Sequence, residues 1–307
     1  MTSIDQSWLE QVVFVGIPGA DGPHSYRVIG TAFWVLLPIP QRPSQVLLYL
    51  VTARHIVENG ISDQLSIRVN RRTPGSSWIL IPSRHWFTHH ETDVAVCRFT
   101  IEGAPIEDFA IQGIPFARLV GPNCRYHGPF DGARAMGHDG KAGVAVHIGD
   151  EIIMVTLLVE RSGQPHNLPV ARFGRVSRLP DEPIPMETDE GGHNFKTTGY
   201  LSEALSIGGV SGAPAYVCFP TYHVITKAKH KDARLLQASE YALLGLVSGH
   251  FDRRTVVRGS PPSAISTERL YVGQNTGISV ITPAHHITEL LNRPDVVSER
   301  DAAKSRT

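Results

Sequence analysis

Short runs of β-branched and aromatic residues recur along this chain, and a turn-forming segment closes each run. The first such runs lie at 11–17, 26–37, 45–53, 65–70, 77–82 and 93–99. Segments such as GADGP and RRTPGSS, which are rich in turn-forming residues, separate them. Short strands at this spacing are typical of antiparallel barrels and sandwiches, because each strand can pair with the next one through a turn. Apart from a possible helical turn after His55, the first third of the chain therefore predicts β-structure.

The pattern loosens from about residue 101 to residue 143, where Gly and Pro become frequent, and a second series of strand-like runs follows. These runs lie at 143–148, 151–159, 170–179, 213–219, 241–250 and 277–282. Two polar stretches between them, at 181–198 and 221–239, are interpreted as loops. The segment 283–293, PAHHITELLNR, has a Pro near its start and apolar residues at helical spacing, which predicts one helix packed on the second half.

Charge and cysteine content exclude several classes of protein. Lys+Arg and Asp+Glu are equal at 29 each, so the sequence offers no electrostatic reason to expect nucleic acid or an anionic membrane as partner. The first residues lack the pattern of a secretory signal, and no window reaches the ~18 apolar residues of a membrane span. Cys97, Cys124 and Cys218 are odd in number and lack CxxC spacing, which argues against disulfides and zinc knuckles. We expect a cytoplasmic protein, and nothing in the sequence sets its oligomeric state.

A glycine-bounded serine is the first candidate for chemistry. In SIGGVSGAPAYV, residues 206–217, Ser211 lies among Gly208, Gly209 and Gly212. Glycines allow a sharp turn that exposes the hydroxyl and lets backbone N–H groups converge beside it. Acyl transfer needs this combination of a nucleophile and donors for the developing oxyanion. A turn of this composition can also be no more than a turn.

A serine nucleophile needs a base, and the base needs a carboxylate that orients it. His55, at the end of LVTARH, and Asp93, which opens the strand-like DVAV, are the candidates. Each residue also has a structural reading, as a polar group at a strand end or as a turn cap. The two come from the first half of the chain and the serine from the second, which would place the three at a cleft between the halves.

The ordered segments GTAFWVL, LVTARH, TDVAV, GGVSGAP, LLGLVSGH and NTGISVITP resemble the signatures of trypsin/chymotrypsin-like serine peptidases, and in particular the bacterial, disulfide-free, non-secreted type. The resemblance covers roughly residues 11–291. It implies an all-β fold of two six-stranded antiparallel barrels of the chymotrypsin type with a C-terminal helix. An N-terminal barrel at 1–120 would carry His55 and Asp93, a connection would span 121–142, and the barrel at 143–307 would carry Ser211 and end in the helix.

The resemblance also implies a role for each residue of a serine endopeptidase that cleaves polypeptides through an acyl-enzyme intermediate, without cofactor. His55 would be the base, Asp93 its orienter and Ser211 the nucleophile, and the amides of Gly209 and Ser211 would form the oxyanion hole. Ser248 would support the triad carboxylate. The backbone of 248–250, which includes Gly249 and His250, would pair with the substrate, and Gly277 would leave room in the specificity pocket.

Several positions depart from the secreted members of that family. Val210 stands where those members have an Asp that pairs with a cleaved amino terminus, so that activation is not expected. Leu205 falls at the expected pocket floor in place of an acid, which favours an apolar or small substrate side chain over Arg or Lys. Ala213 replaces a Gly two residues after the serine.

Three other interpretations of the sequence are open. An α/β-hydrolase needs a helix after its serine and the order Ser, Asp, His, whereas AYVCF reads as a strand and the best His and Asp come earlier. The histidine-rich HWFTHHE at 85–91 lacks HExxH spacing, so His85, His89 and Glu91 predict no metal site. A catalytically silent trypsin-like module that serves binding or regulation is the remaining alternative, and the presence of all three catalytic residue types favours the enzyme.

Overall fold

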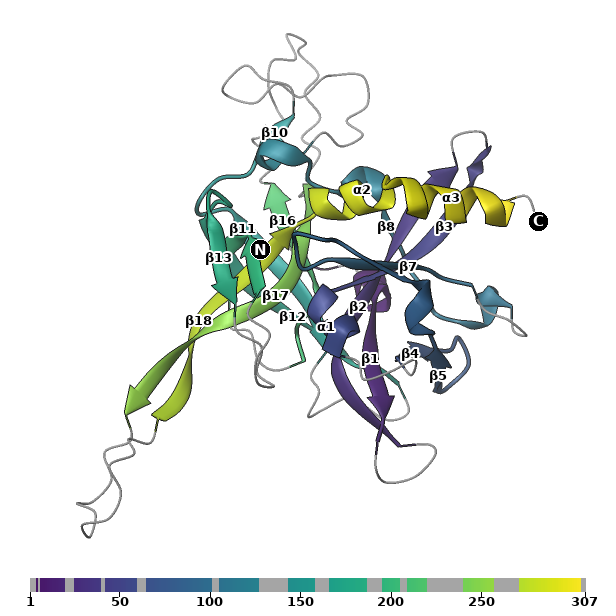
Figure 1. The fold of residues 1–307 in the computed structure, drawn as a ribbon, viewed down its shortest axis with the longest axis horizontal. Helices are drawn as coiled ribbons and strands as arrows, with labels where there is room; N and C mark the ends of the chain where they lie inside the picture. Colours follow the sequence, from purple (N-terminus) through teal and green to yellow (C-terminus); the bar gives the residue numbers. More distant parts are fainter. Residues whose placement is uncertain are drawn as a thin grey trace.

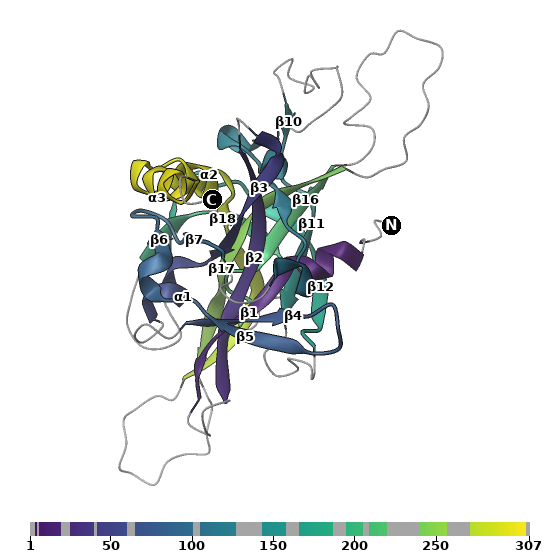
Figure 2. The same ribbon diagram turned by 90° about the vertical axis from the view of Figure 1, so that its right-hand side faces the viewer.

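A computed structural model gives the arrangement of the chain, with β-strands dominating both halves and helices at the C-terminal end (Figures 1 and 2). It describes residues 4, 6–19, 25–39, 42–59, 65–100, 105–126, 143–157, 166–186, 195–204, 209–219, 240–256 and 271–304. Every strand-like run read from the sequence contains an observed strand, so the prediction of a β-rich protein is confirmed.

The first half forms an eight-stranded sheet, mostly antiparallel. Its path runs β5-β4-β1-β2-β3-β7-β6, and β8 lies beside β2. The strands are β1 (Val12–Pro18), β2 (Tyr26–Ile39), β3 (Arg42–Thr52), β4 (Ser66–Asn70), β5 (Ser76–Leu80), β6 (Trp86–Thr88), β7 (Ala95–Arg98) and β8 (Ile114–Pro115). Six of the seven residues of β1 are buried, which explains why this strand reads as a continuous apolar run and not as an alternation.

The first half does not show the closed six-stranded barrel that the sequence led us to expect. The sheet path ends at β5 on one side and at β6 on the other, and no described pairing joins these two edges. Between them the chain leaves the ladder at Ile81, whose N–H bonds to Leu65 O at 2.7 Å, and turns through a 3₁₀ helix at Ser83–His85. The chain passes from β5 to β6 through this turn, and the two edges are not paired within the described residues.

The second half is a closed barrel of six strands, as predicted, in the order β11-β12-β15-β18-β17-β16. Its strands are β11 (Glu151–Leu157), β12 (Pro169–Arg178), β15 (Tyr200–Glu203), β16 (Pro214–Phe219), β17 (Glu240–Val256) and β18 (Tyr271–Pro283). The far ends of β17 and β18 project from the barrel as a long hairpin (Figure 1). Two short pairs accompany the barrel, β9 (Arg125–Tyr126) with β10 (Val144–Ala145), and β13 (Pro183–Met186) with β14 (Phe195–Thr198).

Two parts of the sequence-based organisation were wrong. The stretch 181–198, predicted as a loop, contains the β13–β14 pair, because two prolines conceal an edge strand that needs few donors. The C-terminal segment forms two helices, α2 (His285–Leu291) and α3 (Pro294–Lys304), where one was predicted, and α2 contacts β7 of the first half as well as β18 of the barrel. Arg293 Nη1 donates to Thr88 O at 2.6 Å, and Arg98 Nε lies 3.0 Å from a carboxylate oxygen of Glu299.

The two halves share apolar packing. Ile153 and Val155 of the barrel belong to the same buried cluster as Phe14 and Val15 of β1. The indole N–H of Trp8, in a 3₁₀ helix at Gln6–Gln11, donates to the hydroxyl oxygen of Tyr241 at 3.0 Å. This bond fastens the 3₁₀ helix to β17. Further 3₁₀ helices lie at Ile106–Asp108, Phe116–Arg118 and Pro122–Cys124.

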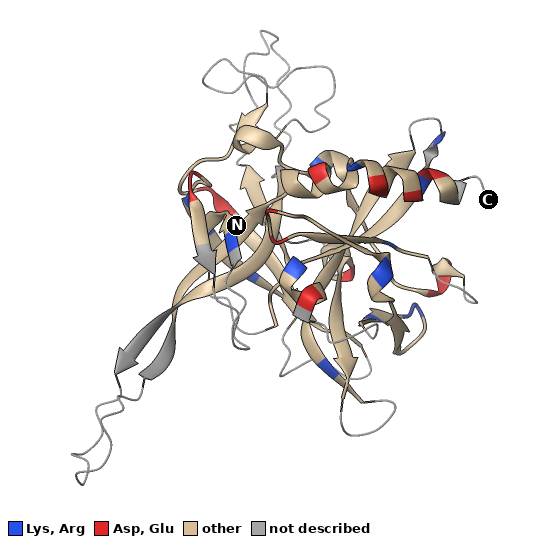
Figure 3. Ribbon diagram, viewed as in Figure 1, with Lys and Arg blue, Asp and Glu red and all other residues tan. Residues whose placement is uncertain are grey.

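Charged residues, cysteines and helices of the described structure bear on the surface of the protein. Lys, Arg, Asp and Glu are interspersed along the described elements (Figure 3). Cys97, Cys124 and Cys218 are free thiols, and two of them are buried. None of the described helices combines the length and the apolar character that crossing a membrane requires.

Candidate active site

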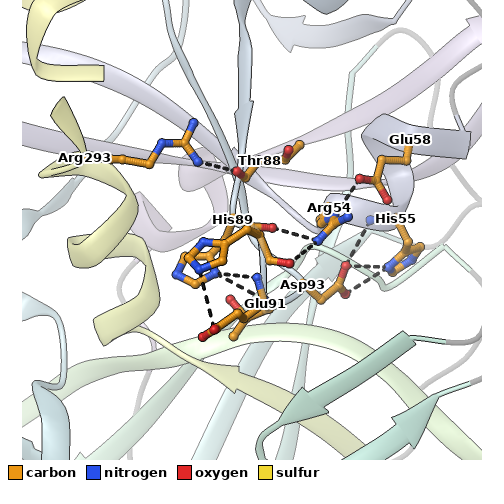
Figure 4. Close-up of polar contacts among 10 residues, drawn as sticks. Arg54, His55, Glu58, Thr88, His89, Glu91, Asp93 and Arg293 are labelled. Carbon is orange, nitrogen blue, oxygen red and sulfur yellow. Dashed lines mark hydrogen bonds and ion pairs between the residues drawn. The ribbon is translucent and has the colours of Figure 1, made fainter. Parts of the chain in front are cut away.

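His55 and Asp93 form a hydrogen-bonded pair at the ends of neighbouring strands. His55 lies at the start of α1 (Arg54–Asn59), just after β3, and Asp93 lies just before β7, which pairs with β3. The ring Nδ1 is 3.0 Å from Asp93 Oδ1 and 2.9 Å from Oδ2, and the backbone N–H of His55 also donates to Oδ1 at 2.9 Å (Figure 4). One carboxylate thus fixes the position of both the backbone and the ring of His55.

The burial of this pair suits a general base. The Asp93 side chain is 1% exposed and that of His55 is 18% exposed. Because a carboxylate only accepts hydrogen bonds, Nδ1 carries the proton of a neutral His55, and Nε2 holds the lone pair that can take a proton. The sequence-based pairing of His55 with Asp93 is therefore present in the structure.

Ser211 lies on a tight turn that leads into β16. Gly212 has φ of +81°, a backbone conformation that favours glycine, and its N–H donates to Val247 O at 2.7 Å. The N–H of Ala213 closes the turn on Val210 O at 3.0 Å. Ser211 itself is half-buried. The turn is thus held to β17, and its central residue keeps partial access to solvent.

Thr31, a residue that the sequence analysis did not single out, ties the Ser211 turn to the first half. Its N–H donates to Ser211 O at 2.9 Å, and its hydroxyl donates to Gly209 O at 2.9 Å. Its own carbonyl accepts from the Thr52 hydroxyl at 2.7 Å, and both threonine side chains are fully buried. Thr31 belongs to the GTAFWVL segment and Thr52 to LVTARH. Both segments were noted for other residues, so the contribution of the threonines was overlooked.

The turn approaches the His55 segment closely enough to exclude side chains. A Cβ added at Gly212 would lie 2.1 Å from Thr31 O and 3.1 Å from Ala53 N, two residues before His55. A Cβ at Gly30 would lie 2.3 Å from Ile56 Cδ1. The Ser211 turn and the β3–α1 junction are therefore in direct contact.

The hydroxyl of Ser211 and the ring of His55 are not joined by a hydrogen bond among the described residues. In unliganded enzymes such a bond is often long and tightens when substrate binds, so its absence does not separate an active from a silent site. The amides of Gly209 and Ser211 donate to no protein group within the described part of the chain, and two such donors on one turn suit an oxyanion.

Ser248 is not hydrogen-bonded to Asp93 in the described structure, in contrast to its expected role. Its buried hydroxyl lies 2.6 Å from Thr282 Oγ1, which in turn lies 2.9 Å from Thr197 Oγ1. These hydroxyls link β17, β18 and β14. Ser248 thus joins neighbouring strands of the barrel, and the hydrogen bonds of Asp93 come from His55.

The residues expected at the substrate pocket fall on β17 and β18. Gly249 pairs with Val280 and His250 with Ser279, whereas the pairing of β17 with β16 stops at Leu246. Gly277 has φ of +80°, and a Cβ added there would meet nothing within 4 Å. Leu205, the expected pocket floor, lies outside the described residues, as does Gly208.

Arg54, beside His55, was also missed by sequence reasoning. Its Nη1 donates to the carbonyls of His89 and His90, each at 2.9 Å, and its Nε pairs with Glu58 at 2.5 Å (Figure 4). The same residue that precedes the base thus holds the loop that precedes Asp93. The residue type alone, an arginine before a histidine, does not indicate that Arg54 holds this loop.

A histidine cluster lies behind Asp93, where no metal site was expected. Ligand atoms of His89, His286 and Glu289 lie within 4.8 Å of one another. However, His89 Nδ1 accepts the N–H groups of Glu91 and Thr92, both at 3.2 Å, so a neutral ring carries its proton on Nε2, the atom that faces Glu289. A metal ligand would need a lone pair there, and the residues as placed do not fit a metal ion.

The chain is similar to solved structures but matches no protein family. No protein-family model matches the chain, and no curated protein matches it. Among solved structures, it is similar to the active form of the Rv3671c protease from M. tuberculosis, with 12% identity, a TM-score of 0.38, and coverage of 94% of this chain and 87% of that one. The inactive form of the Rv3671c protease gives 14% identity, a TM-score of 0.38, and coverage of 95% and 96%.

Proposed function

We propose that this protein is a serine endopeptidase. The observation that carries the proposal is the buried Asp93 carboxylate, which holds both the backbone and ring of His55 beside a braced, glycine-bounded serine turn. A structural histidine would need only one of these hydrogen bonds, whereas a base must keep one tautomer and one orientation through the reaction.

In the proposed mechanism, His55 Nε2 takes the proton of Ser211 Oγ as this oxygen attacks the carbonyl carbon of a peptide bond. The amides of Gly209 and Ser211 would donate to the resulting oxyanion, and Asp93 would stabilise the imidazolium. The imidazolium then gives its proton to the leaving amine, which leaves an acyl-enzyme on Ser211. Water, deprotonated by the same ring, releases the acid and restores the serine.

Substrate would bind as an added strand along residues 248–250. This segment continues β17 beyond the point where β16 ends, and strand addition supplies affinity through the main chain whatever the side chains are. The open space at Gly277 would admit the substrate side chain. With Leu205 expected at the floor, apolar or small residues are the proposed preference.

Labelling with a fluorophosphonate tests the proposal directly, because the probe forms a covalent bond with an activated serine. Wild type and Ser77→Ala, a change in edge strand β5, should both be labelled, and Ser211→Ala should not. Labelling that persists in Ser211→Ala would rule out the assigned nucleophile. If wild type remains unlabelled and cleaves no peptide in a proteome-derived library, the chain is the silent binding module instead.

A further inference from the structure

The loop that leads to Asp93 is folded around the imidazole of His89. The backbone N–H of His89 donates to Val94 O at 2.8 Å, which closes the loop. Inside it, His89 Nδ1 accepts the N–H groups of Glu91 and Thr92, the two residues before Asp93. The His89 side chain is 8% exposed. A buried side chain therefore supplies the acceptor that fixes the backbone next to the carboxylate.

The outer nitrogen of the same ring faces the C-terminal helix α2. His89 Nε2 lies 3.5 Å from Glu289 Oε2, and His286 Nδ1 lies 2.7 Å from that same oxygen. Since Nδ1 of His89 is an acceptor, the neutral ring carries its proton on Nε2, directed at a carboxylate that attracts it. The contact between Arg293 and Thr88 O holds the start of the loop to the same end of the chain (Figure 4).

We propose that His89 is a positioning residue, whose neutral Nε2–H tautomer, favoured by Glu289, holds the loop that places Asp93 against His55. The C-terminal helix would then keep the carboxylate of the first half in position. The effect on catalysis rests on the proposed peptidase function, but the effect on the Asp93–His55 hydrogen bond does not.

Protonation of His89 should release this loop. A second ring proton would sit on Nδ1, directed at two N–H donors that now lose their acceptor. The titratable groups around the ring are His90 and Glu91 on its own loop, and His285, His286 and Glu289 on α2; the His90 ring stacks on it with a centroid distance of 5.0 Å. Burial, followed by the nearby His286 and His90, lowers the pKa of His89 below its usual 6.5, which keeps the ring neutral at neutral pH.

Two substitutions at His89 separate positioning from simple packing. His89→Asn keeps an acceptor oxygen near the site of Nδ1 and cannot be protonated, whereas His89→Leu removes the acceptor. The control is His90→Ala, which changes an exposed neighbour of the same type. The first readout is the downfield proton NMR signal of the His55 ring N–H bonded to Asp93, assigned by its loss in Asp93→Asn.

We expect His89→Leu to lose or broaden this signal and to lower kcat/KM at pH 7.5 by on the order of 10- to 100-fold, as for a misplaced catalytic group. His89→Asn should keep the signal and most of the activity, and His90→Ala should match wild type. Between pH 7.5 and 4.5, the melting temperature of wild type should fall more steeply than that of His89→Asn, because only wild type carries the His89 imidazole, whose lowered pKa makes the unfolded chain bind its proton first.

Three results would overturn the proposal. The signal could persist unchanged in a folded His89→Leu protein, or His89→Asn could perform as poorly as His89→Leu. Alternatively, zinc could raise the melting temperature of wild type but not of Glu289→Ala, which would make the cluster a metal site. If wild type shows the His55 signal and the His89 dependence but no labelling with fluorophosphonate, the peptidase function fails and the positioning role stands.

Discussion

The hydroxyl of Thr31 donates a hydrogen bond of 2.9 Å to the carbonyl of Gly209, which lies 178 residues further along the chain. Together with the bond from the Thr31 N–H to Ser211 O, it fixes the serine turn of the second half on β2 of the first. The buried Thr31 thus contributes to the relative position of His55 and Ser211.

Thr31→Val keeps the shape of the side chain but leaves Gly209 O without its donor. An unsatisfied buried acceptor typically costs about 1–3 kcal/mol of the free energy of unfolding, and for the part-buried Gly209 O we expect about 1 kcal/mol, the lower end of that range. We also expect kcat/KM to fall by on the order of tenfold or more, because the amides of the turn lose their orientation. Urea unfolding and peptidase kinetics measure the two effects. Thr31→Ser, which retains the hydroxyl, should recover most of both, and equal losses in the two variants would show that the hydroxyl is dispensable.

Gly212→Ala should be far more damaging than a change at a glycine of similar conformation in open space. Both Gly212 and Gly149 have positive φ, so alanine at either carries about 1–2 kcal/mol of backbone strain. Only at Gly212 would the new Cβ also lie 2.1 Å from a carbonyl oxygen, whereas at Gly149 it meets nothing within 4 Å. The difference in free energy of unfolding between Gly212→Ala and Gly149→Ala measures the cost of the contact between the new Cβ and Thr31 O. Similar values for the two variants would contradict that contact.

If the proposed peptidase function holds, His55, Asp93 and Ser211 should behave as one unit. His55→Ala and Ser211→Ala should each lower kcat by on the order of 10⁴-fold or more, and the double variant should be scarcely worse, because neither group works without the other. Activity of wild type should rise through roughly pH 6–8, since the base must be neutral. Kinetics of the two single variants and the double variant provide the check, and losses that multiply would indicate two independent contributions.

His285 should make stability depend on pH. Burial, followed by the positive charge of His286, lowers its pKa to about 4 in the folded protein, against 6.5 as its usual value. The unfolded chain therefore binds a proton first as pH falls, so His285 favours the folded state fully above about pH 6.5 and this contribution is lost progressively towards pH 4. We expect a loss on the order of 1–2 kcal/mol over this range, after allowance for partial exposure. Urea unfolding at several pH values should show a shallower dependence for His285→Gln, and an unchanged slope would exclude the residue.

Sequence reasoning worked where a local pattern determines the structure. Runs of β-branched and aromatic residues bounded by turn residues located the strands, and strand ends bearing His55 and Asp93 predicted a pair that the structure brings together. It failed where a partner distant in sequence decides the outcome. The hydroxyl of Ser248 could bond to any nearby acceptor, and Thr282 on the next strand lies within reach. Likewise, the strand pattern cannot say whether the edges β5 and β6 meet.

The apolar face of α2 could be predicted from the sequence, whereas the surface against which this face packs could not. Ile287, Leu290 and Leu291 are buried and fit either half as hydrophobic groups. Polar contacts that are particular to the first sheet accompany their packing, namely Arg293 with Thr88 and Arg98 with Glu299. Such pairs join segments that are distant along the chain, so no local window contains them.

This packing has a consequence for the order of events during synthesis. Ala284, Ile287 and Val296 complete an apolar cluster whose other members include Phe33 and Val96 of the first sheet. That sheet emerges from the ribosome long before these residues, and until they arrive one of its apolar surfaces stays uncovered. A nascent chain would therefore hold His55 and Asp93 on an incomplete support until the helices dock, and the activity proposed for this pair would begin only then.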